Sequence, residues 1–396
     1  MVTRAQIALL LQVFVVAKTS CLTRCYTQYF HQVNPTALPL ACSDLKDGDV
    51  NESLPITSRR RVLQAAATAS SALLATPTFA VSSDPTATDN DAETITTPLE
   101  FVPALSAYVV HFFVFGERFG AIVDTGSPFL TLPCRCNKFA YKYIWGCYKP
   151  ELTEASGYSN TVEGFNSNQG TVVWRKASFS FHETEPTENL VFGVLGPDLL
   201  DGPGGVFLGL IKDTDKWIRP SFLGQTGYQS FRVDLRPDDP KLVLSKKPMI
   251  LDDEDYVPLT RDLSKRYGAP VNHYHAKASG FVVNGLPLRL SDNKPTYVIF
   301  DTGVSGMVVS EELFDGRYLQ ARKNKEKSLW GKVQVSLTTM RGNTVQLEAT
   351  KPVATPLGEV TQWRKFKGNL IVLGLAFLDG VAMTIDIDDR KLQISE

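Results

Sequence analysis

Two copies of one motif constrain this chain more than any other feature of its sequence. Each is an aspartate that follows an apolar run and precedes Thr-Gly, in residues 121–127 (AIVDTGS) and 298–305 (VIFDTGVS). The glycine permits a backbone turn that a side chain would obstruct. At average residue usage, two chance copies of one tripeptide are improbable, on the order of one in 1,000. The pair therefore indicates an internal duplication, and we consider two unrelated solvated turns the less favoured interpretation.

Two aspartates held at the ends of facing loops can perform general acid–base chemistry. If similar halves bring Asp124 and Asp301 together, the two carboxyls cannot both ionise and must share a proton. The ionised carboxyl can deprotonate a water while the protonated one donates to a carbonyl oxygen. This chemistry hydrolyses an amide without a covalent intermediate, so the sequence predicts neither a cofactor nor a metal.

From about Phe101 to the C-terminus, the chain resembles the pepsin-like aspartic proteases, and the atypical plant and algal members more than pepsin itself. In that family two apolar residues and a glycine cross behind each catalytic loop, and residues 206–209 (VFLG) and 371–374 (IVLG) fit. The resemblance implies a mainly β, bilobal pepsin-like fold, with two similar β-barrel-like lobes around a central cleft. The lobes would span residues 101–240 and 241–396.

The distribution of β-branched and aromatic residues is consistent with a mainly β fold. Short runs of them are separated by Gly, Pro, Asn and Asp, and one helix is expected at residues 311–322. The clearest strand candidates are residues 108–115, 171–181, 277–283, 333–337 and 383–387. Roughly 300 residues remain from Phe101 to the C-terminus, which is enough for both lobes, so we expect a monomer.

The resemblance also assigns roles around the two catalytic aspartates, Asp124 and Asp301. The threonines brace the two loops against each other, and the Ser127 hydroxyl donates to its own aspartate, which favours the charged form. The residues that support the catalytic loops are Thr125, Gly126, Ser127, Thr302 and Gly303. Val304 stands where most relatives have serine or threonine, so Asp301 lacks one donor. We expect this to raise the upper apparent pKa of the pair and to move activity towards weakly acid pH.

The flap that covers the cleft in this family is a weaker match. Counting back from Gly170, the usual flap tyrosine falls on Glu163, and the tryptophan that braces it is replaced by Thr131. The candidate flap residues are Tyr158, Glu163, Gly164 and Phe165. A plain polar loop over residues 156–169 is about as well supported as a working flap.

Three cysteines follow the first catalytic loop: Cys134, Cys136 and Cys147. An oxidising compartment would allow one disulfide, joining Cys147 to either Cys134 or Cys136, and the sequence leaves both pairings open. Metal binding by the three is the minority interpretation. His273 and His275 could share one face of a strand, but no third ligand is evident nearby.

The first hundred residues are predicted to be targeting segments. Residues 1–17 resemble a secretory signal peptide, 18–57 a transit peptide or spacer, and 58–80 a twin-arginine signal cleaved after Ala80; an acidic linker, 81–100, follows. Two export signals in series indicate a thylakoid-lumen protein of a complex plastid. The alternative is a secreted or vacuolar (lysosomal) protein in which most of this region is a propeptide.

These observations favour an aspartic endopeptidase that binds an extended polypeptide between its lobes. The alternative is a catalytically weak pepsin-fold protein used for polypeptide or inhibitor binding, because a fold does not dictate a function. The formal net charge is −1 and no segment is strongly basic, so we expect no nucleic-acid partner. We also expect no stable membrane anchor in the mature chain.

Overall fold

The computed structural model describes residues 93–134, 145–165, 168–183, 188–196, 206–212, 220–269, 271–288, 294–357 and 366–396. The predictions for residues 1–92 and for Cys136 lie outside these residues. The described chain is mainly β, as expected, and forms sheets of 14 and 8 strands. Within it, no helix combines the length and the apolar character needed to cross a membrane.

The larger sheet is built from the N-terminal part of the chain and from its last two strands. It contains β1 (Thr94–Val102), β2 (Ala107–Val114), β3 (Glu117–Asp124), β4 (Thr131–Pro133), β5 (Glu154–Ala155), β6 (Thr161–Phe165), β7 (Asn168–Ser180), β8 (Glu188–Leu195), β9 (Phe207–Gly209), β10 (Ser230–Asp234), β11 (Lys241–Ser245), β12 (Val257–Pro258), β21 (Ala382–Asp386) and β22 (Lys391–Ser395).

The smaller sheet belongs to the C-terminal half. It contains β13 (His275–Val283), β14 (Leu286–Pro287), β15 (Thr296–Phe300), β16 (Met307–Ser310), β17 (Lys332–Thr338), β18 (Thr344–Thr350), β19 (Ala354–Leu357) and β20 (Asn369–Leu373). The longest helix of the described residues is α5 (Glu311–Lys323). The other helical segments are short: η4 (Pro150–Leu152), α4 (Phe222–Thr226), η5 (Asp262–Arg266) and α6 (Leu375–Leu378).

The strand and helix predictions are confirmed. All five predicted strands are present, as β2, β7, β13, β17 and β21, and the predicted helix is α5, with ends that differ by no more than three residues. In β17, buried and more exposed residues alternate, which is the pattern of a strand with one face on a core. Every residue of β15 and of β20 is buried, as expected where strands are covered on both faces.

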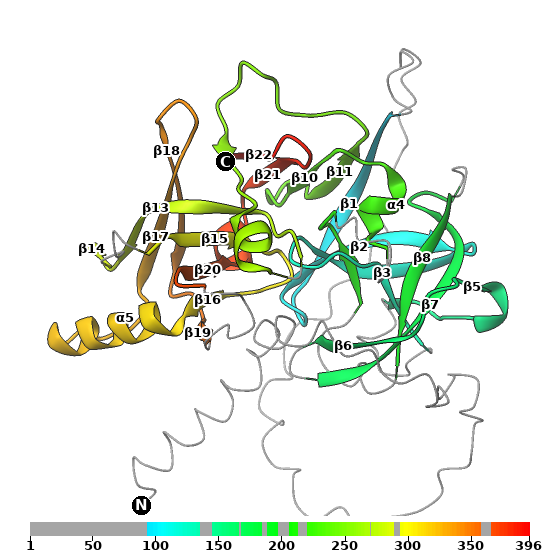
Figure 1. Cartoon of the computed structure of the whole chain (residues 1–396), viewed down its shortest axis with the longest axis horizontal. Coiled ribbons are helices and arrows are strands. Elements are labelled where there is room, and N and C mark those ends of the chain that lie inside the picture. The colour runs from blue at the N-terminus through cyan, green and yellow to red at the C-terminus, as the bar shows by residue number, and fades with distance from the viewer. Residues whose placement is uncertain are drawn as a thin grey trace, which may run out of the picture.

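The last two strands connect the halves of the chain. In the larger sheet, β10 pairs with both β11 and β21, and β21 pairs with β22. In Figure 1 these strands lie in the upper middle of the view, between β17 and β18 on the left and β7 and β8 on the right. A continuous cluster of buried apolar side chains extends through both sheets, and a smaller one surrounds Tyr297.

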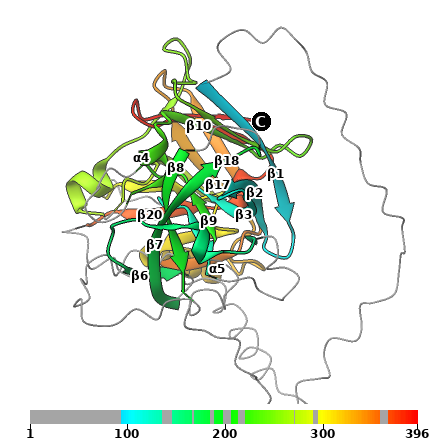
Figure 2. The ribbon, with the colours of Figure 1, turned by 90° about the vertical axis from the view of Figure 1, so that its right-hand side faces the viewer.

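Strand β1 begins earlier than the sequence suggested. Thr94 to Pro98 pair with β11, and Leu99 to Val102 pair with β2. Figure 2 shows β1 as one long strand along an edge of the molecule. The predicted acidic linker is therefore wrong for residues 94–100. The segment is polar, but Thr97 and Leu99 are buried at alternate positions, which is strand spacing.

Candidate active site

Two parallel strand pairs position the duplicated aspartates in the same way. Strand β3 ends at Asp124 and runs parallel to β9, with Asp124 opposite Gly209. Strand β15 ends just before Asp301 and runs parallel to β20, with Phe300 opposite Leu373. The segments predicted to cross behind the catalytic loops therefore lie directly beside the strands that carry the aspartates.

The glycines that end these segments are required by the close approach of two backbones. A Cβ atom on Gly209 would lie under 3.0 Å from the backbone of Ser127 to Phe129, and one on Gly374 would meet the backbone of Val304 and Gly306 equally closely. The Gly209 amide donates to Phe129 O, and the Gly374 amide donates to Gly306 O, both at 2.9 Å. Each carbonyl belongs to the fifth residue after its aspartate, so the two loops are held alike.

The two loops that carry Asp124 and Asp301 are joined by a reciprocal set of threonine hydrogen bonds. The Thr125 amide donates to Thr302 Oγ1 at 3.1 Å, and the Thr302 amide donates to Thr125 Oγ1 at 3.0 Å. The Thr125 hydroxyl donates to Phe300 O at 2.8 Å, and that of Thr302 donates to Val123 O at 2.7 Å. Both threonines are buried, so the chain brings the loops together in the manner predicted for them.

The carboxyl groups of Asp124 and Asp301 lie next to each other. A Cβ atom on Gly126 would be under 3.0 Å from all three carboxyl atoms of Asp301, and one on Gly303 would be about as close to the carboxyl of Asp124. Each glycine amide also donates to its own aspartate, at 2.7 Å from Gly126 and 2.9 Å from Gly303. The carboxyls themselves are within hydrogen-bond reach. The structure thus unites two residues that are separated by 177 positions.

Burial determines the electrostatics of this pair. Asp124 is 7% exposed and Asp301 is 5% exposed. Burial raises the pKa of the Asp124 carboxyl, because desolvation disfavours its charge, and donation from Ser127 and Gly126 only partly opposes the rise. Adjacent carboxyls titrate as a unit, so the proton that remains at mildly acid pH belongs to the pair.

The residues that follow the two aspartates differ in chemistry. Ser127 lies close enough to lower the pKa of Asp124, although its hydroxyl completes no well-aligned hydrogen bond within the described residues. Val304 is half-buried and packs on the smaller apolar cluster, which includes Leu263 and Tyr297. A side chain that carries no donor therefore occupies the position next to the second aspartate's turn.

The predicted flap is a hairpin of β6 and β7, in which Glu163 lies opposite Gly170 and Phe165 opposite Asn168. Glu163 is buried, and Gly164 is the next residue of β6. Tyr158 lies outside the hairpin, in the segment before β6, where it is half-buried against the main core.

Thr131 contacts the start of β9. Its hydroxyl accepts a 2.8 Å hydrogen bond from the Phe207 amide and so fixes the start of β9. The threonine therefore supports the first catalytic loop from behind.

The cysteine predictions are only partly covered by the structure. Cys134 is buried at the end of β4, and Cys147 is half-buried near η4. Cys136 lies outside the described residues, so the choice of disulfide partner stays a prediction.

The two neighbouring histidines, His273 and His275, are both buried. His275 Nδ1 is 2.9 Å from His273 O, its Nε2 accepts from the Leu263 amide at 3.4 Å, and His273 Nδ1 is 3.3 Å from Val271 O. In the described part of the chain, no three His, Cys, Asp or Glu side chains gather as metal ligands would. Burial lowers the pKa of His273 to about 3 and that of His275 to about 4.

We expect these histidines to make the fold sensitive to acid. Both folded-state pKa values lie below the unfolded value of about 6.5, so below that pH the unfolded chain binds more protons. The contribution of the two histidines to the free energy of unfolding is fully present above about pH 6.5. Below that pH it falls by about 1.4 kcal/mol per pH unit for each histidine, until the folded-state pKa of that histidine is reached. His275→Gln should therefore lose less stability between pH 7 and 4.5 in urea unfolding. An equal loss in this variant, in the exposed control His182→Gln and in the unaltered chain would contradict this account.

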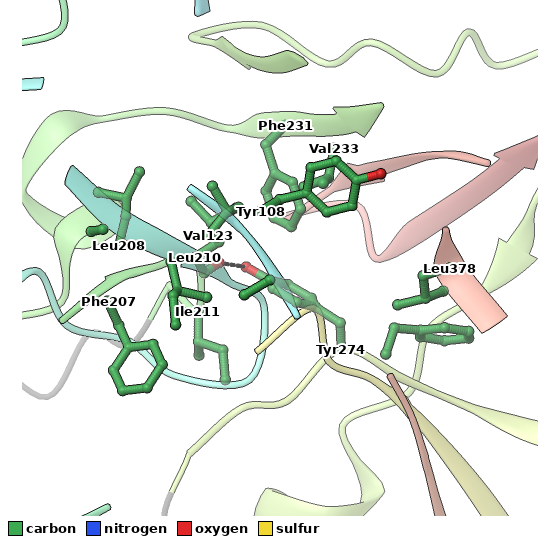
Figure 3. Close-up of a cluster of buried hydrophobic side chains, with 14 of the residues drawn as sticks. Tyr108, Val123, Phe207, Leu208, Leu210, Ile211, Phe231, Val233, Tyr274 and Leu378 are labelled. Atoms are coloured by element: carbon green, nitrogen blue, oxygen red, sulfur yellow. Dashed lines mark hydrogen bonds between the residues drawn. The ribbon is translucent and has the colours of Figure 1, made fainter. Parts of the chain in front are cut away.

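Further cross-contacts fix the two halves around the aspartates. Tyr274, which is buried just before β13, donates to Leu210 O at 2.7 Å and accepts from the Lys212 amide at 3.3 Å. Figure 3 shows the bond between Tyr274 and Leu210 among buried apolar side chains that include Val123. The Tyr108 hydroxyl donates to Asp379 at 2.6 Å. Sequence reasoning missed both tyrosines, because a lone tyrosine carries no signal for its hydrogen-bond partner.

Searches with this sequence match no protein-family model and no curated protein.

Proposed function

We propose that this chain is an aspartic endopeptidase with a bilobal, pepsin-like fold. The observation that carries the proposal is the pair of adjacent carboxyls, Asp124 and Asp301, on equivalent loops that two threonines join. The equivalent strand pairs β3–β9 and β15–β20 support a duplicated, two-lobed architecture. An extended polypeptide would bind between the lobes, with its backbone paired to strand edges and its side chains in apolar subsites.

The chemistry follows from one shared proton. The ionised carboxyl removes a proton from a water held between the two groups, and the water oxygen bonds to the peptide carbonyl carbon. The protonated carboxyl donates to the carbonyl oxygen, which gives a neutral tetrahedral diol. When the diol collapses, one of its hydroxyls returns a proton to the ionised carboxyl, the carbon–nitrogen bond breaks, and the leaving nitrogen takes a proton from the protonated carboxyl. The new carboxylic acid and amine then depart, and the pair again holds one proton.

A direct assay tests this proposal. The purified chain, processed at its N-terminus, should cleave an unfolded protein between about pH 4 and 7, and a pepstatin-type inhibitor should block the cleavage. Inhibitor binding without cleavage would favour the alternative, a pepsin-fold protein that only binds polypeptides. If the chain neither binds the inhibitor nor cleaves the protein, the fold-based proposal as a whole is rejected.

Val304→Thr should shift the pH dependence of this activity. A threonine hydroxyl at this position can donate to Asp301 and so favour its ionised form, which lowers the upper apparent pKa of the pair. The pH profile of kcat/KM should then move towards acid by about 0.5–1 unit, since a single hydrogen bond contributes about 1 kcal/mol. Val304→Ala is the matched control, because it alters packing without adding a donor. The same profile for both variants would argue against this role.

The start of β1 is compatible with the cleavage after Ala80 that the proposed lumen location requires. Cleavage after Ala80 would leave β1 whole, together with the hydrogen bond from the Lys246 amide to Glu93 O. A mature chain that begins at Phe101 would lose the part of β1 that pairs with β11. Removal of the leader as a long propeptide is therefore the less compatible of the two processing schemes.

A further inference from the structure

The hairpin of β6 and β7 contains an internal brace that no sequence motif announced. Trp174, on β7, is 2% exposed, and its indole Nε1 donates to Thr161 Oγ1 on β6 at 3.1 Å. Thr161 lies opposite Val172, so the bond joins residues that are diagonal neighbours across the two strands. Each strand of the hairpin is thus tied to the other by side chains as well as by backbone.

The same tryptophan contacts the catalytic loop. Its ring packs edge-on against Phe129, with the ring centroids 5.3 Å apart. Phe129 lies five residues after Asp124, and its carbonyl accepts from the Gly209 amide, behind the loop. One rigid side chain therefore connects β6 to the segment that positions the first aspartate.

The remaining contacts fix the tryptophan from the other side. The Ser156 hydroxyl donates to Trp174 O at 2.8 Å, and a Cβ atom on Gly193, in the neighbouring strand β8, would lie 3.4 Å from the indole ring. In the described residues, β6 pairs only with β7. Under the proposed function, its other edge would pair with an extended polypeptide. The indole holds the strand that presents this edge.

We propose that Trp174 and Thr161 form the brace that positions the flap over the catalytic aspartates, in place of the tyrosine and tryptophan absent at Glu163 and Thr131. This inference rests on the proposed protease function. Trp174 is a positioning residue, which acts through Thr161 and Phe129 and does not touch the scissile bond.

Thr161→Val and Trp174→Phe test the brace, because each removes the hydrogen bond and keeps most of the side-chain volume. We expect kcat/KM and the affinity for a pepstatin-type inhibitor to fall by about 10-fold, the effect of one lost hydrogen bond at a buried donor. Thr161→Ser, which retains the hydroxyl, should restore both values. Leu319→Ala, an exposed side chain of α5 outside the hairpin, is the control and should leave them unchanged.

Amide hydrogen exchange provides a readout that does not depend on activity. Exchange of the β6 amides should be faster in Thr161→Val and Trp174→Phe than in the unaltered chain, and normal in Thr161→Ser, with the global unfolding free energy only slightly changed. Unchanged exchange, or cleavage as fast as in the unaltered chain, would overturn the brace. An unaltered chain that cleaves nothing would instead reject the protease function, while the exchange data would still decide whether the brace holds the hairpin.

Discussion

Asp124→Asn is expected to lower kcat/KM by about 10³-fold or more, the range over which positioned acid–base groups accelerate reactions. The amide keeps the shape of the carboxyl and can still accept from the Gly126 amide, but it can neither take a proton from water nor share one with Asp301. Asp301→Asn should have the same effect. Because the pair acts as a unit, the double variant should be little worse than either single one.

The control for this comparison is Asp388→Asn, a surface carboxyl whose partner is Lys212. It should retain full activity, because an exposed ion pair contributes little to stability. All variants should be shown to be folded by circular dichroism before the rates are compared. A single aspartate variant that keeps a tenth of the normal rate would contradict acid–base catalysis by this pair.

Gly374→Ala is expected to destabilise the fold by about 3 kcal/mol or more, or to prevent folding. Its added methyl group would press on the backbone of Val304 and Gly306, which cannot rotate away as a flexible side chain can. The displaced loop carries Asp301, so activity should fall as well. Gly209→Ala should behave alike in the first half, where the clash is with the backbone of residues 127–129.

Gly316→Ala supplies the matched glycine control for these measurements. Gly316 lies in α5, and a Cβ atom there meets nothing within 4 Å. Alanine should raise the free energy of unfolding by about 0.5–1 kcal/mol, because it has the higher helix propensity. Urea unfolding of the three variants measures both effects. Equal stabilities of Gly374→Ala and Gly316→Ala would show that the two backbones do not need the close approach.

The parts of the structure that local patterns encode could be predicted from the sequence. The strand runs and the helix at residues 311–323 follow from residue spacing, and the Asp-Thr-Gly motif fixes the turn that follows β3 and β15. The duplication was the only signal that residues 177 positions apart must meet. Thr125 and Thr302 could be assigned their brace because they belong to that motif.

The remaining features depend on register and on contacts between distant segments. To predict the bond from Trp174 to Thr161, one must know that Thr161 lies opposite Val172 across the hairpin, and no residue type reveals this register. The start of β1 was missed because its partner strand, β11, lies far along the chain. Tyr274 likewise finds its acceptor, Leu210, in the other half of the molecule.

The most direct test of the central claim is a pH titration of the Asp124 and Asp301 carboxyl carbons by ¹³C NMR in the processed chain. A shared proton predicts two well-separated apparent pKa values, one below and one above the ordinary aspartate value of about 3.9. Asp301→Asn should abolish the two-step behaviour, so that the remaining carboxyl titrates once. Two independent titrations near the ordinary value, unaffected by replacement of the neighbour, would contradict the account.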